Sequence, residues 1–321
     1  MREIKLPPLR LPPNFNYVGV FLTFSCQLRC TYCINHHGGD LVKQRRMNAD
    51  DWIQGLNRIT TRDDLPLTLQ GGEPSAYKDY LQVIAGIKPE TPIDMLTNLE
   101  LNPNQLNEFM RRIPPGRLRR DSKYASIRVS YHHGQSEWGP LLQRVLTLKT
   151  HGYSVGIWEV DHPSYHSEVI YRQQEATSLG VDYRLKEFLG PHKGVNHGTF
   201  RYEEAVNARE LRTCSCRTSE LLIGPGGGIF RCHSDLYANR TPIGHILDSG
   251  MGLERLGQWN ERLGQWRLCK VMGKCNSCDL KVKTNRFQEY GHSSVDIEHV
   301  SAPTGVNTAY VEEVDNTYGR R

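Results

Sequence analysis

The stretch that decides the fold is VGVFLTFSCQLRCTYC, residues 18–33. Its first part, residues 18–24, is apolar and rich in β-branched and aromatic side chains, which is typical of a buried strand. Three cysteines, Cys26, Cys30 and Cys33, follow at once. The sequence therefore predicts a loop with metal-binding chemistry directly after a buried strand.

On the C-terminal side of that strand, the chain alternates between strand and helix patterns. Apolar, β-branched runs predict six strands, at residues 18–24, 65–70, 93–97, 126–131, 155–160 and 181–188. Helix signals lie between them, at residues 48–60, 78–87, 105–112, 141–151 and 167–179. Alternation of this kind favours parallel strands joined by right-handed crossovers.

Several of these strands carry polar residues on one face, for example Thr68 with Gln70 and Arg128 with Ser130. A fully packed barrel interior would be apolar. We therefore expect an α/β fold with a partial (βα)6 TIM-like barrel over residues 18–190 that encloses a wet cavity. The alternative is that these polar faces are solvent-exposed edges of the sheet.

Composition restricts the class of protein. The 321 residues include 40 Lys and Arg against 35 Asp and Glu, a formal net charge of +5, with 38% hydrophobic and 23% charged residues. These values exclude a disordered or fibrous chain, and so small a charge argues against a nucleic-acid partner. No apolar run approaches the roughly 18 residues of a membrane span, and residues 1–17 lack a signal-peptide stretch. We expect a cytoplasmic protein with no membrane partner.

The nine cysteines carry the most chemical information. Their number is odd and the expected compartment is reducing, so we do not expect a disulfide framework. Three lie near the start of the chain, and the other six lie between positions 214 and 278. This distribution predicts two separate metal sites, one near each end of the fold. The nine are Cys26, Cys30, Cys33, Cys214, Cys216, Cys232, Cys269, Cys275 and Cys278.

The first site has the spacing CxxxCxxC on one tight loop. Three thiolates can hold three irons of a [4Fe–4S] cluster, which usually has four cysteine ligands. One iron then keeps an open coordination position of the kind that catalytic metal sites need. Zinc is the competing interpretation, because His36 or His37 could complete a Cys3His site.

With the aromatic Tyr32 before its third cysteine, this loop resembles the CxxxCxΦC loop of radical S-adenosylmethionine enzymes. A second motif, GGEP, follows the second predicted strand and matches a motif of the same superfamily. Its residues are Gly71, Gly72, Glu73 and Pro74. The resemblance covers residues 18–190 and, separately, residues 214–278.

The resemblance implies two cofactors, the [4Fe–4S] cluster and S-adenosylmethionine. It implies that the amino and carboxylate groups of S-adenosylmethionine chelate the open iron, that an electron cleaves the carbon–sulfur bond, and that the 5′-deoxyadenosyl radical abstracts a substrate hydrogen. The backbone of Gly71, Gly72 and Glu73 is implied to receive the methionine amino group, where a Cβ would block close approach. Asn98 and Ser130 resemble polar residues near the ribose and carboxylate, or else make ordinary strand-end hydrogen bonds.

The second cysteine set reads Cys214-x12-Gly227-x4-Cys232, followed by a CxxC pair. It resembles the SPASM and twitch auxiliary-cluster segments, in which two ligands lie on a hairpin. Six cysteines are too few for two auxiliary clusters, so we expect one auxiliary [4Fe–4S] cluster. Its expected ligands are Cys214, Cys232, Cys275 and Cys278. Cys216 and Cys269 stay open as alternative ligands, and a structural zinc site stays open as the alternative metal.

These signals divide the chain into an N-terminal extension, the barrel, a linker, an auxiliary-cluster domain and a tail. The auxiliary-cluster domain is expected to contain a hairpin, residues 221–223 and 229–230, and a helix. A tandem duplication, ERLGQWN then ERLGQWR at residues 254–267, predicts an amphipathic helix there. The boundaries are 1–17, 18–190, 191–213, 214–291 and 292–321.

Three functional classes fit these motifs. The first is a radical S-adenosylmethionine oxidoreductase that acts on a small molecule or a peptide and takes its electrons from a partner such as flavodoxin or ferredoxin. The second is a glycyl-radical activating enzyme, whose usual ferredoxin-like insert is not visible here. The third is a non-enzymatic zinc or iron–sulfur module. We favour the first class.

Alternation along the last predicted strand suggests where the substrate lies. Leu185 suits the helix-packed outside, so Arg184 and Lys186 would point into the barrel. Two cations in a partly dehydrated cavity need anionic partners, which could be Glu159, the carboxylate of S-adenosylmethionine or an acidic substrate group. We therefore predict a polar substrate, with an anionic one as an open alternative and Glu159 as a candidate for its deprotonation. The alternative is that Arg184 and Lys186 form surface salt bridges.

Overall fold

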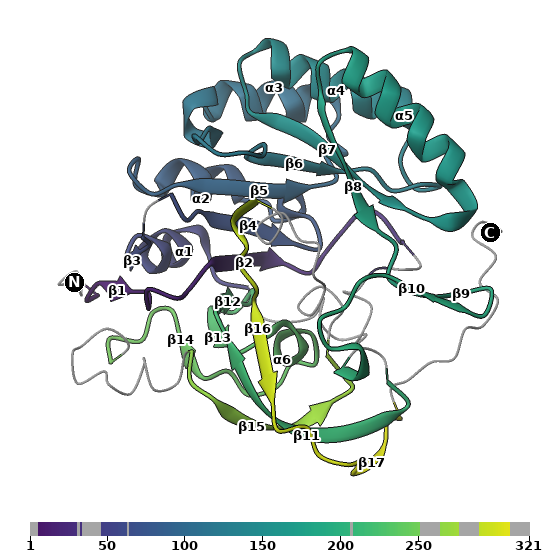
Figure 1. The fold of residues 1–321 in the computed structure, drawn as a ribbon. Coiled ribbons are helices and arrows are strands. Elements are labelled where there is room, and N and C mark those ends of the chain that lie inside the picture. Colours follow the sequence, from purple (N-terminus) through teal and green to yellow (C-terminus); the bar gives the residue numbers. More distant parts are fainter. Residues whose placement is uncertain are drawn as a thin grey trace.

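The fold is described from a computed structural model that covers residues 6–30, 33, 46–62, 64–205, 208–250, 264–275 and 289–308. Its centre is a nine-stranded sheet with the strand order β14-β13-β12-β2-β4-β5-β6-β7-β8 (Figure 1). Seven of these strands, from β12 to β8 in that order, run parallel. The molecule is therefore a mixed α/β fold with a large parallel sheet.

All six strands predicted in residues 18–190 lie side by side in this sheet. They are β2 (Tyr17–Thr23), β4 (Leu67–Gly71), β5 (Ile93–Thr97), β6 (Ile127–Ser130), β7 (Val155–Asp161) and β8 (Asp182–Glu187). Each pairs in parallel with the next. Their order follows the sequence because each crossover carries the chain back across one side of the sheet.

The five predicted helices also form, and their ends follow local capping. They are α1 (Ala49–Leu56), α2 (Tyr80–Gly86), α3 (Pro103–Arg112), α4 (Trp138–Thr150) and α5 (His166–Ser178). The side chain of Asn48 accepts a hydrogen bond from the Asp51 N–H at 2.8 Å, which caps α1. Asn102 and Gln105 form a reciprocal capping box at the start of α3.

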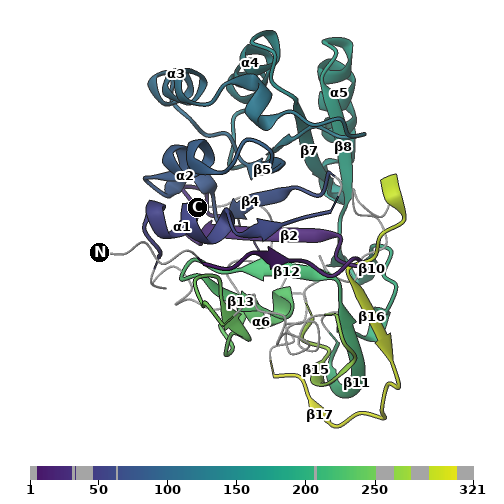
Figure 2. The same ribbon diagram turned by 90° about the vertical axis from the view of Figure 1, so that its left-hand side faces the viewer.

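Alternate residues of each strand give this sheet two different faces. Val18, Val20 and Leu22 of β2 share one hydrophobic core with Trp52 of α1 and Ile84 of α2. We call this side, along which α1 to α5 lie, the helix face (Figures 1 and 2). The other side we call the opposite face. It carries Tyr17, Phe21, Gln70, Arg128, Ser130, Trp158, Arg184 and Lys186.

The C-terminal part of the chain contributes to two sheets. The predicted hairpin forms as β12 (Glu220–Ile223) and β13 (Gly228–Phe230), but β12 also pairs in parallel with β2. With β14 (Gly244–His245) these strands extend the main sheet. The short helix α6 (His233–Tyr237) packs on the opposite face, where Leu236 and Tyr237 contact Phe21 and Phe24.

A separate four-stranded sheet holds the remaining C-terminal strands. Its central strand β11 (Glu210–Thr218) pairs with β15 (Arg267–Met272), β16 (Val295–Glu298) and β17 (Gly305–Val306). The expected boundary between residues 213 and 214 thus lies inside β11, and part of the expected tail is paired strand. Within the segment predicted as an amphipathic helix, the described residues 264–266 are not helical and Arg267 begins β15.

Shorter elements complete the described fold. In the N-terminal extension, β1 (Leu9–Arg10) pairs with β3 (Ile59–Thr60). In the expected linker, β9 (Gly190–His192) and β10 (Val195–His197) form a hairpin. Four short 3-10 helices lie at Pro74–Ala76, Pro115–Leu118, Pro163–Tyr165 and Glu203–Ala205. Among the described residues, no helix has the length and apolar character that a membrane crossing requires.

Candidate functional site

The first cysteine loop leaves the carboxyl end of β2. The thiol of Cys26 accepts a hydrogen bond from the Leu28 N–H at 3.4 Å, and the Cys33 N–H donates to the Cys30 carbonyl at 3.1 Å. Cys30 is buried, Cys33 is half-buried and Cys26 is exposed. These contacts turn the chain back on itself, so the loop is tight. The predicted site residue Tyr32 lies outside the described residues, as do His36 and His37 of the zinc alternative.

The GGEP loop is bound to the cysteine loop through backbone hydrogen bonds. The Gly72 N–H donates to the Thr23 carbonyl at 2.7 Å, and the Glu73 N–H donates to the Ser25 carbonyl at 2.9 Å. A Cβ on Gly72 would lie only 2.3 Å from the Ser25 carbonyl oxygen. The glycine is therefore needed for the close approach of the two loops, whichever ligand they bind.

The side chain of Glu73 contributes to the structure of the site. Its side chain is fully buried and accepts hydrogen bonds from the Thr97 hydroxyl at 2.8 Å and the Asn98 N–H at 2.7 Å. It also accepts from the Ser75 N–H at 3.1 Å, which caps the short helix that Pro74 begins. Burial raises the pKa of this carboxyl while these hydrogen bonds lower it. The carboxylate thus joins the ends of β4 and β5.

Asn98 lies between the end of β5 and the cysteine loop. Its side-chain NH2 lies 3.6 Å from the Cys26 sulfur, and its side-chain oxygen accepts from the Gln27 side chain at 3.0 Å. The same oxygen accepts from the Glu100 N–H at 3.0 Å, which is an ordinary strand-end contact. Asn98 therefore combines the local role with a contact to the first thiol.

The three-thiol loop fits a metal cluster chemically. Partial desolvation raises the pKa of Cys26 most, and the nearby Glu73 carboxylate and Cys33 thiol raise it further, although hydrogen bonds from Leu28 and Asn98 lower it. A thiolate in this setting gains strongly from a cation beside it. A site that disfavours free thiolates but brings them to one loop is suited to bind a metal or an iron–sulfur cluster.

Ser130 and the two predicted cations lie on the opposite face. Tyr183 and Leu185 belong to the core beneath the helices, so Arg184 and Lys186 point away from it, as the alternation predicts. Arg184 pairs with Asp182 at 3.0 Å and with Glu289 at 2.7 Å. Arg184 is therefore a paired cation, and the contacts that support the salt-bridge alternative are present.

Lys186 lies close to His132, at the carboxyl end of β6. Burial, and secondarily the positive charge of Lys186, lower the pKa of His132 to about 4. His132 is therefore a neutral imidazole at pH 7. Its location on a loop beside the opposite face makes it a polar group near the predicted substrate region.

Glu159, one of the three anionic partners considered for these cations, pairs instead with Arg172. Glu159 is 2% exposed and lies on the helix face, where it accepts hydrogen bonds from Arg172 of α5 at 2.6 and 3.1 Å and from the Tyr183 hydroxyl. Alternation along β7 puts Trp158 on the opposite face and Glu159 against the helices. A buried carboxylate with these partners stabilises the packing of α5, on the side of the sheet away from Arg184 and Lys186.

The C-terminal thiols gather on the four-stranded sheet. Cys214 of β11 faces Cys269 of β15 in register, and both are buried. The hydrogen bond between the two thiols lowers the pKa of Cys269 to about 6, and Arg231 adds to this effect. Cys216, two residues further along β11 than Cys214, and Cys275 are both near enough to influence Cys214 electrostatically.

The expected auxiliary ligands differ in the contacts that the structure shows for them. Cys275 influences Cys214 electrostatically, Cys232 and Cys269 both influence Arg231, and Cys278 lies outside the described residues. Cys269, which the spacing offered only as an alternative ligand, is the direct neighbour of Cys214. Within the described ranges, no three His, Cys, Asp or Glu side chains are arranged to hold a single metal ion.

Sequence reasoning missed a group of polar side chains on the opposite face, around Tyr17 at the start of β2. The Gln70 side chain donates to the Tyr17 hydroxyl at 2.7 Å, and His233 lies 3.1 Å from the Glu220 carboxylate. The rings of Tyr17 and His233 are 6.1 Å apart. The signal was an acidic residue, Glu220, at the start of an otherwise apolar strand, but its neighbour β2 is too distant in sequence to be recognised from the pattern.

Comparison with known proteins gives partial matches. No protein-family model matches the chain. It is 40% identical over 85 residues to a GTP 3′,8-cyclase of Paenarthrobacter nicotinovorans, covering 24% of this chain and 23% of that protein. It is 28% identical over 106 residues to the GTP 3′,8-cyclase of Agrobacterium fabrum, covering 32% and 30%. The chain thus spans less than a third of these relatives. They support the radical S-adenosylmethionine superfamily that the motifs indicate.

Among solved structures, the chain is similar to the enzyme anSMEcpe. One match is the native protein with bound AdoMet and a peptide, at a TM-score of 0.46 and 12% identity, covering 88% of each chain. Another is the native protein with bound AdoMet, at a TM-score of 0.47 and 12% identity, covering 85% and 87%.

Proposed function

We propose that this chain is a radical S-adenosylmethionine enzyme with one auxiliary [4Fe–4S] cluster, acting on a polar small molecule such as a sugar or cyclitol, or on a peptide side chain. One observation carries the proposal. The loop of Cys26, Cys30 and Cys33 and the GGEP loop leave adjacent parallel strands at the same edge, and two backbone hydrogen bonds of 2.7 and 2.9 Å join them. Thiol ligands and a glycine-lined backbone therefore meet at one point.

In this proposal each of the two loops binds a different cofactor. Cys26, Cys30 and Cys33 would hold the [4Fe–4S] cluster, with Tyr32 beside them, and the backbone of residues 71–74 would bind the methionine end of S-adenosylmethionine. Asn98 and Ser130 would contact its ribose and carboxylate. Together the two cofactors would supply a strong hydrogen-atom abstractor.

The protein's own contribution is to orient the cofactors and the substrate. Glu73 fixes the end of β4 against the end of β5, because its carboxylate accepts from Thr97 and Asn98. The amide of Asn98 lies beside the Cys26 sulfur, where a donor would stabilise a thiolate. Phe21 and Phe24, packed on α6, border the opposite face beneath the loop and would keep water from it.

The auxiliary cluster would be held by thiols of the C-terminal region. We propose Cys214, Cys232, Cys275 and Cys278 as its ligands, and the contact between Cys214 and Cys269 supports Cys269 as a further candidate. Such a cluster would take an electron from the oxidised substrate or bind the substrate directly, in keeping with an oxidoreductase.

The substrate and partners are proposed from the charges of the opposite face. Arg184 and Lys186 would lie near a polar substrate, with Arg184 held by Asp182 and Glu289. A flavodoxin or ferredoxin would supply the electron, and such partners fit the cytoplasm as the compartment.

Release of 5′-deoxyadenosine tests this proposal. The wild-type chain is reconstituted anaerobically with iron and sulfide, reduced, and incubated with S-adenosylmethionine. We expect 5′-deoxyadenosine from the wild type and none from Cys30→Ala, with Cys216→Ala as a thiol-loss control that keeps the first loop intact. Zinc without iron in the protein would favour the non-enzymatic module, and a requirement for a partner protein as hydrogen donor would favour a glycyl-radical activating enzyme.

A further inference from the structure

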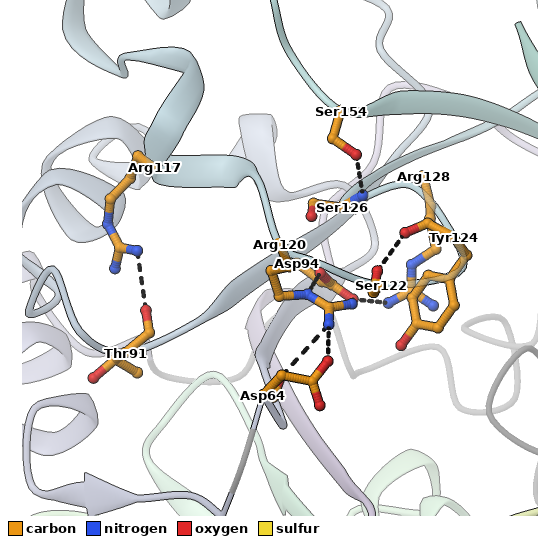
Figure 3. Close-up of polar contacts among 10 residues, drawn as sticks. All are labelled: Asp64, Thr91, Asp94, Arg117, Arg120, Ser122, Tyr124, Ser126, Arg128 and Ser154. Carbon is orange, nitrogen blue, oxygen red and sulfur yellow. Dashed lines mark hydrogen bonds and ion pairs between the residues drawn. The ribbon is translucent and has the colours of Figure 1, made fainter. Parts of the chain in front are cut away.

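Arg128 occupies a central point on the opposite face. It lies on β6, in register with Leu96 of β5 on one side and Gly156 of β7 on the other. Gly156 itself has no side chain, and the ring of Trp158, two residues further along β7, lies over it. Its own side chain is 11% exposed, and its guanidinium lies over the ring of Tyr124 at 5.3 Å (Figure 3).

The nearest carboxylate is already used by another arginine. Asp94 is fully buried and is held by Arg120 through two hydrogen bonds of 2.7 and 3.0 Å (Figure 3). Arg128 reaches the same carboxylate only through one nitrogen, at 3.4 Å. The Nε atom of Arg128 is buried and makes no hydrogen bond in the described part of the protein.

Arg120 and Arg128 share the carboxylates of this cluster unequally. Arg120 and Arg128 contribute two positive charges, and Asp94 contributes one negative charge. Asp64 contributes a second negative charge and binds Arg120 at 2.8 Å, so both carboxylates are bound chiefly by Arg120 and Arg128 has only the 3.4 Å contact with Asp94. Asp182 lies in the same register row as Arg128 but two strands away, about 10 Å, and Arg184 binds it.

A buried guanidinium without a full counter-charge is costly unless a ligand supplies that charge. We propose that Arg128 anchors an oxyanion of the substrate, a carboxylate or a phosphate, on the opposite face. The planar guanidinium offers parallel N–H groups that match either group, and its Nε is one donor that still lacks an acceptor.

The position of Arg128 fits this role within the proposed function, on which the inference rests. Ser130, two residues further along β6, lies on the same face about 7 Å nearer the carboxyl edge. The cysteine and GGEP loops lie at that edge. An anionic group bound at Arg128 would therefore leave the rest of the substrate directed toward the two loops. Arg184, which the alternation favoured as the anion contact, already has two carboxylates of its own.

Anion binding to the full-length chain tests the inference. Unfolding temperature is measured with inorganic phosphate in one arm and succinate in the other, each against sodium chloride at equal ionic strength. We expect at least one anion to raise the unfolding temperature of the wild type. Arg128→Gln should need about tenfold more of it, since a charge-assisted hydrogen bond is lost. The control is Arg111→Gln, because both the Nε and a terminal nitrogen of Arg111 already donate to the Glu108 carboxylate.

Two further measurements test the role of Arg128 independently of whether Arg128→Gln folds. If Arg128→Gln does not fold, Arg128→Lys keeps the charge, loses the fork geometry and should bind the anion more weakly than the wild type. In the wild type, the anion should slow modification of Arg128 by phenylglyoxal. An equal response of Arg128→Gln and wild type, or no response of the wild type to either anion, would overturn the inference. Because the assay needs neither iron nor S-adenosylmethionine, its failure is distinct from failure of 5′-deoxyadenosine release.

Discussion

The two cysteine-rich regions differ in what lies behind their thiols. The loop of Cys26, Cys30 and Cys33 leaves a sheet whose helix face is closed by an extensive apolar core that contains none of these thiols. In the C-terminal sheet, by contrast, Cys214 and Cys269 are themselves core residues, packed with Met272, Val295 and Ile297.

In the first region, the residues that stabilise the fold are different from the thiols that would bind the cluster. In the second region, the same thiols would do both. The helix-covered sheet has apolar side chains enough to fold without a metal, so its thiols can be changed without loss of the fold. The C-terminal sheet buries few side chains besides its thiols, so we expect changes to them to loosen it. The predictions that follow test this contrast.

The largest effect is expected from Gly72→Ala. The added Cβ would lie 2.3 Å from the Ser25 carbonyl oxygen and 2.4 Å from that of Phe24, so the two loops must separate. We expect the first cluster to be lost, which lowers iron by about four per chain, while far-ultraviolet circular dichroism is unchanged. Gly139→Ala is the control, because a Cβ there meets nothing within 4 Å. A full iron content in Gly72→Ala would contradict the close-approach argument.

Glu159→Gln should destabilise the helix-covered sheet strongly. It leaves the guanidinium of Arg172, whose side chain is 8% exposed, without its buried partner, and breaking such a pair costs about 3–5 kcal/mol. Glu168→Gln is a matched control, because Glu168 contacts the same arginine at 3.7 Å from an exposed position and should matter by less than about 1 kcal/mol. Urea unfolding measures both.

The same Glu159→Gln variant also tests whether Glu159 has a catalytic role. At a temperature where Glu159→Gln is folded, we expect wild-type 5′-deoxyadenosine release and wild-type substrate turnover. Loss of turnover without loss of stability would return Glu159 to the candidate catalytic residues.

Cys214→Ser should loosen the C-terminal sheet alone. It buries a hydroxyl among apolar side chains and changes the contact with Cys269, at a cost of about 1–3 kcal/mol. Limited proteolysis should cut faster around β11, β15, β16 and β17 and leave the main sheet, β12 to β14 included, protected. Cys26→Ser, at an exposed thiol, is the control and should not change the cleavage pattern. Equal protection of both variants would remove the contrast between the regions.

The smallest effect concerns pH. His132 has a pKa of about 4 in the folded chain against an ordinary value of about 6.5, so the unfolded chain binds more protons between these values. The contribution of this histidine to the free energy of unfolding is fully present above about pH 6.5 and is lost as the pH falls toward 4. Thermal unfolding from pH 4 to 7.5 should show a shallower decline for His132→Asn than for the wild type. Equal slopes for His132→Asn and the wild type would contradict the assignment.

Much of the helix-covered sheet could be predicted from the sequence, because its signals are local. Apolar runs such as residues 18–24 and caps such as Asn48 depend on neighbours a few positions away. Glu159 could not be assigned to a face in this way. Strand alternation gives two sets of residues, but only Arg172, supplied by α5, decides which set faces the helices.

The C-terminal region was harder to predict because its contacts are non-local. Pairing of Glu220 with Tyr17 joins residues some two hundred positions apart, and no periodicity reports such a contact. β16 has only four residues, Val295–Glu298, too few for alternation to separate a strand from a tail. The contact of Cys214 with Cys269 likewise depends on register across β11 and β15 rather than on cysteine spacing.

One measurement tests the central claim most directly, the yield of 5′-deoxyadenosine from two triple variants. One changes Cys26, Cys30 and Cys33 to Ala, and the other changes Cys214, Cys232 and Cys275 to Ala. We predict no 5′-deoxyadenosine from the first, with about four irons per chain retained at the C-terminal site, and continued cleavage of S-adenosylmethionine by the second. Release of 5′-deoxyadenosine by the first variant, or its complete loss in a second variant whose helix-covered sheet is still folded, would contradict the account.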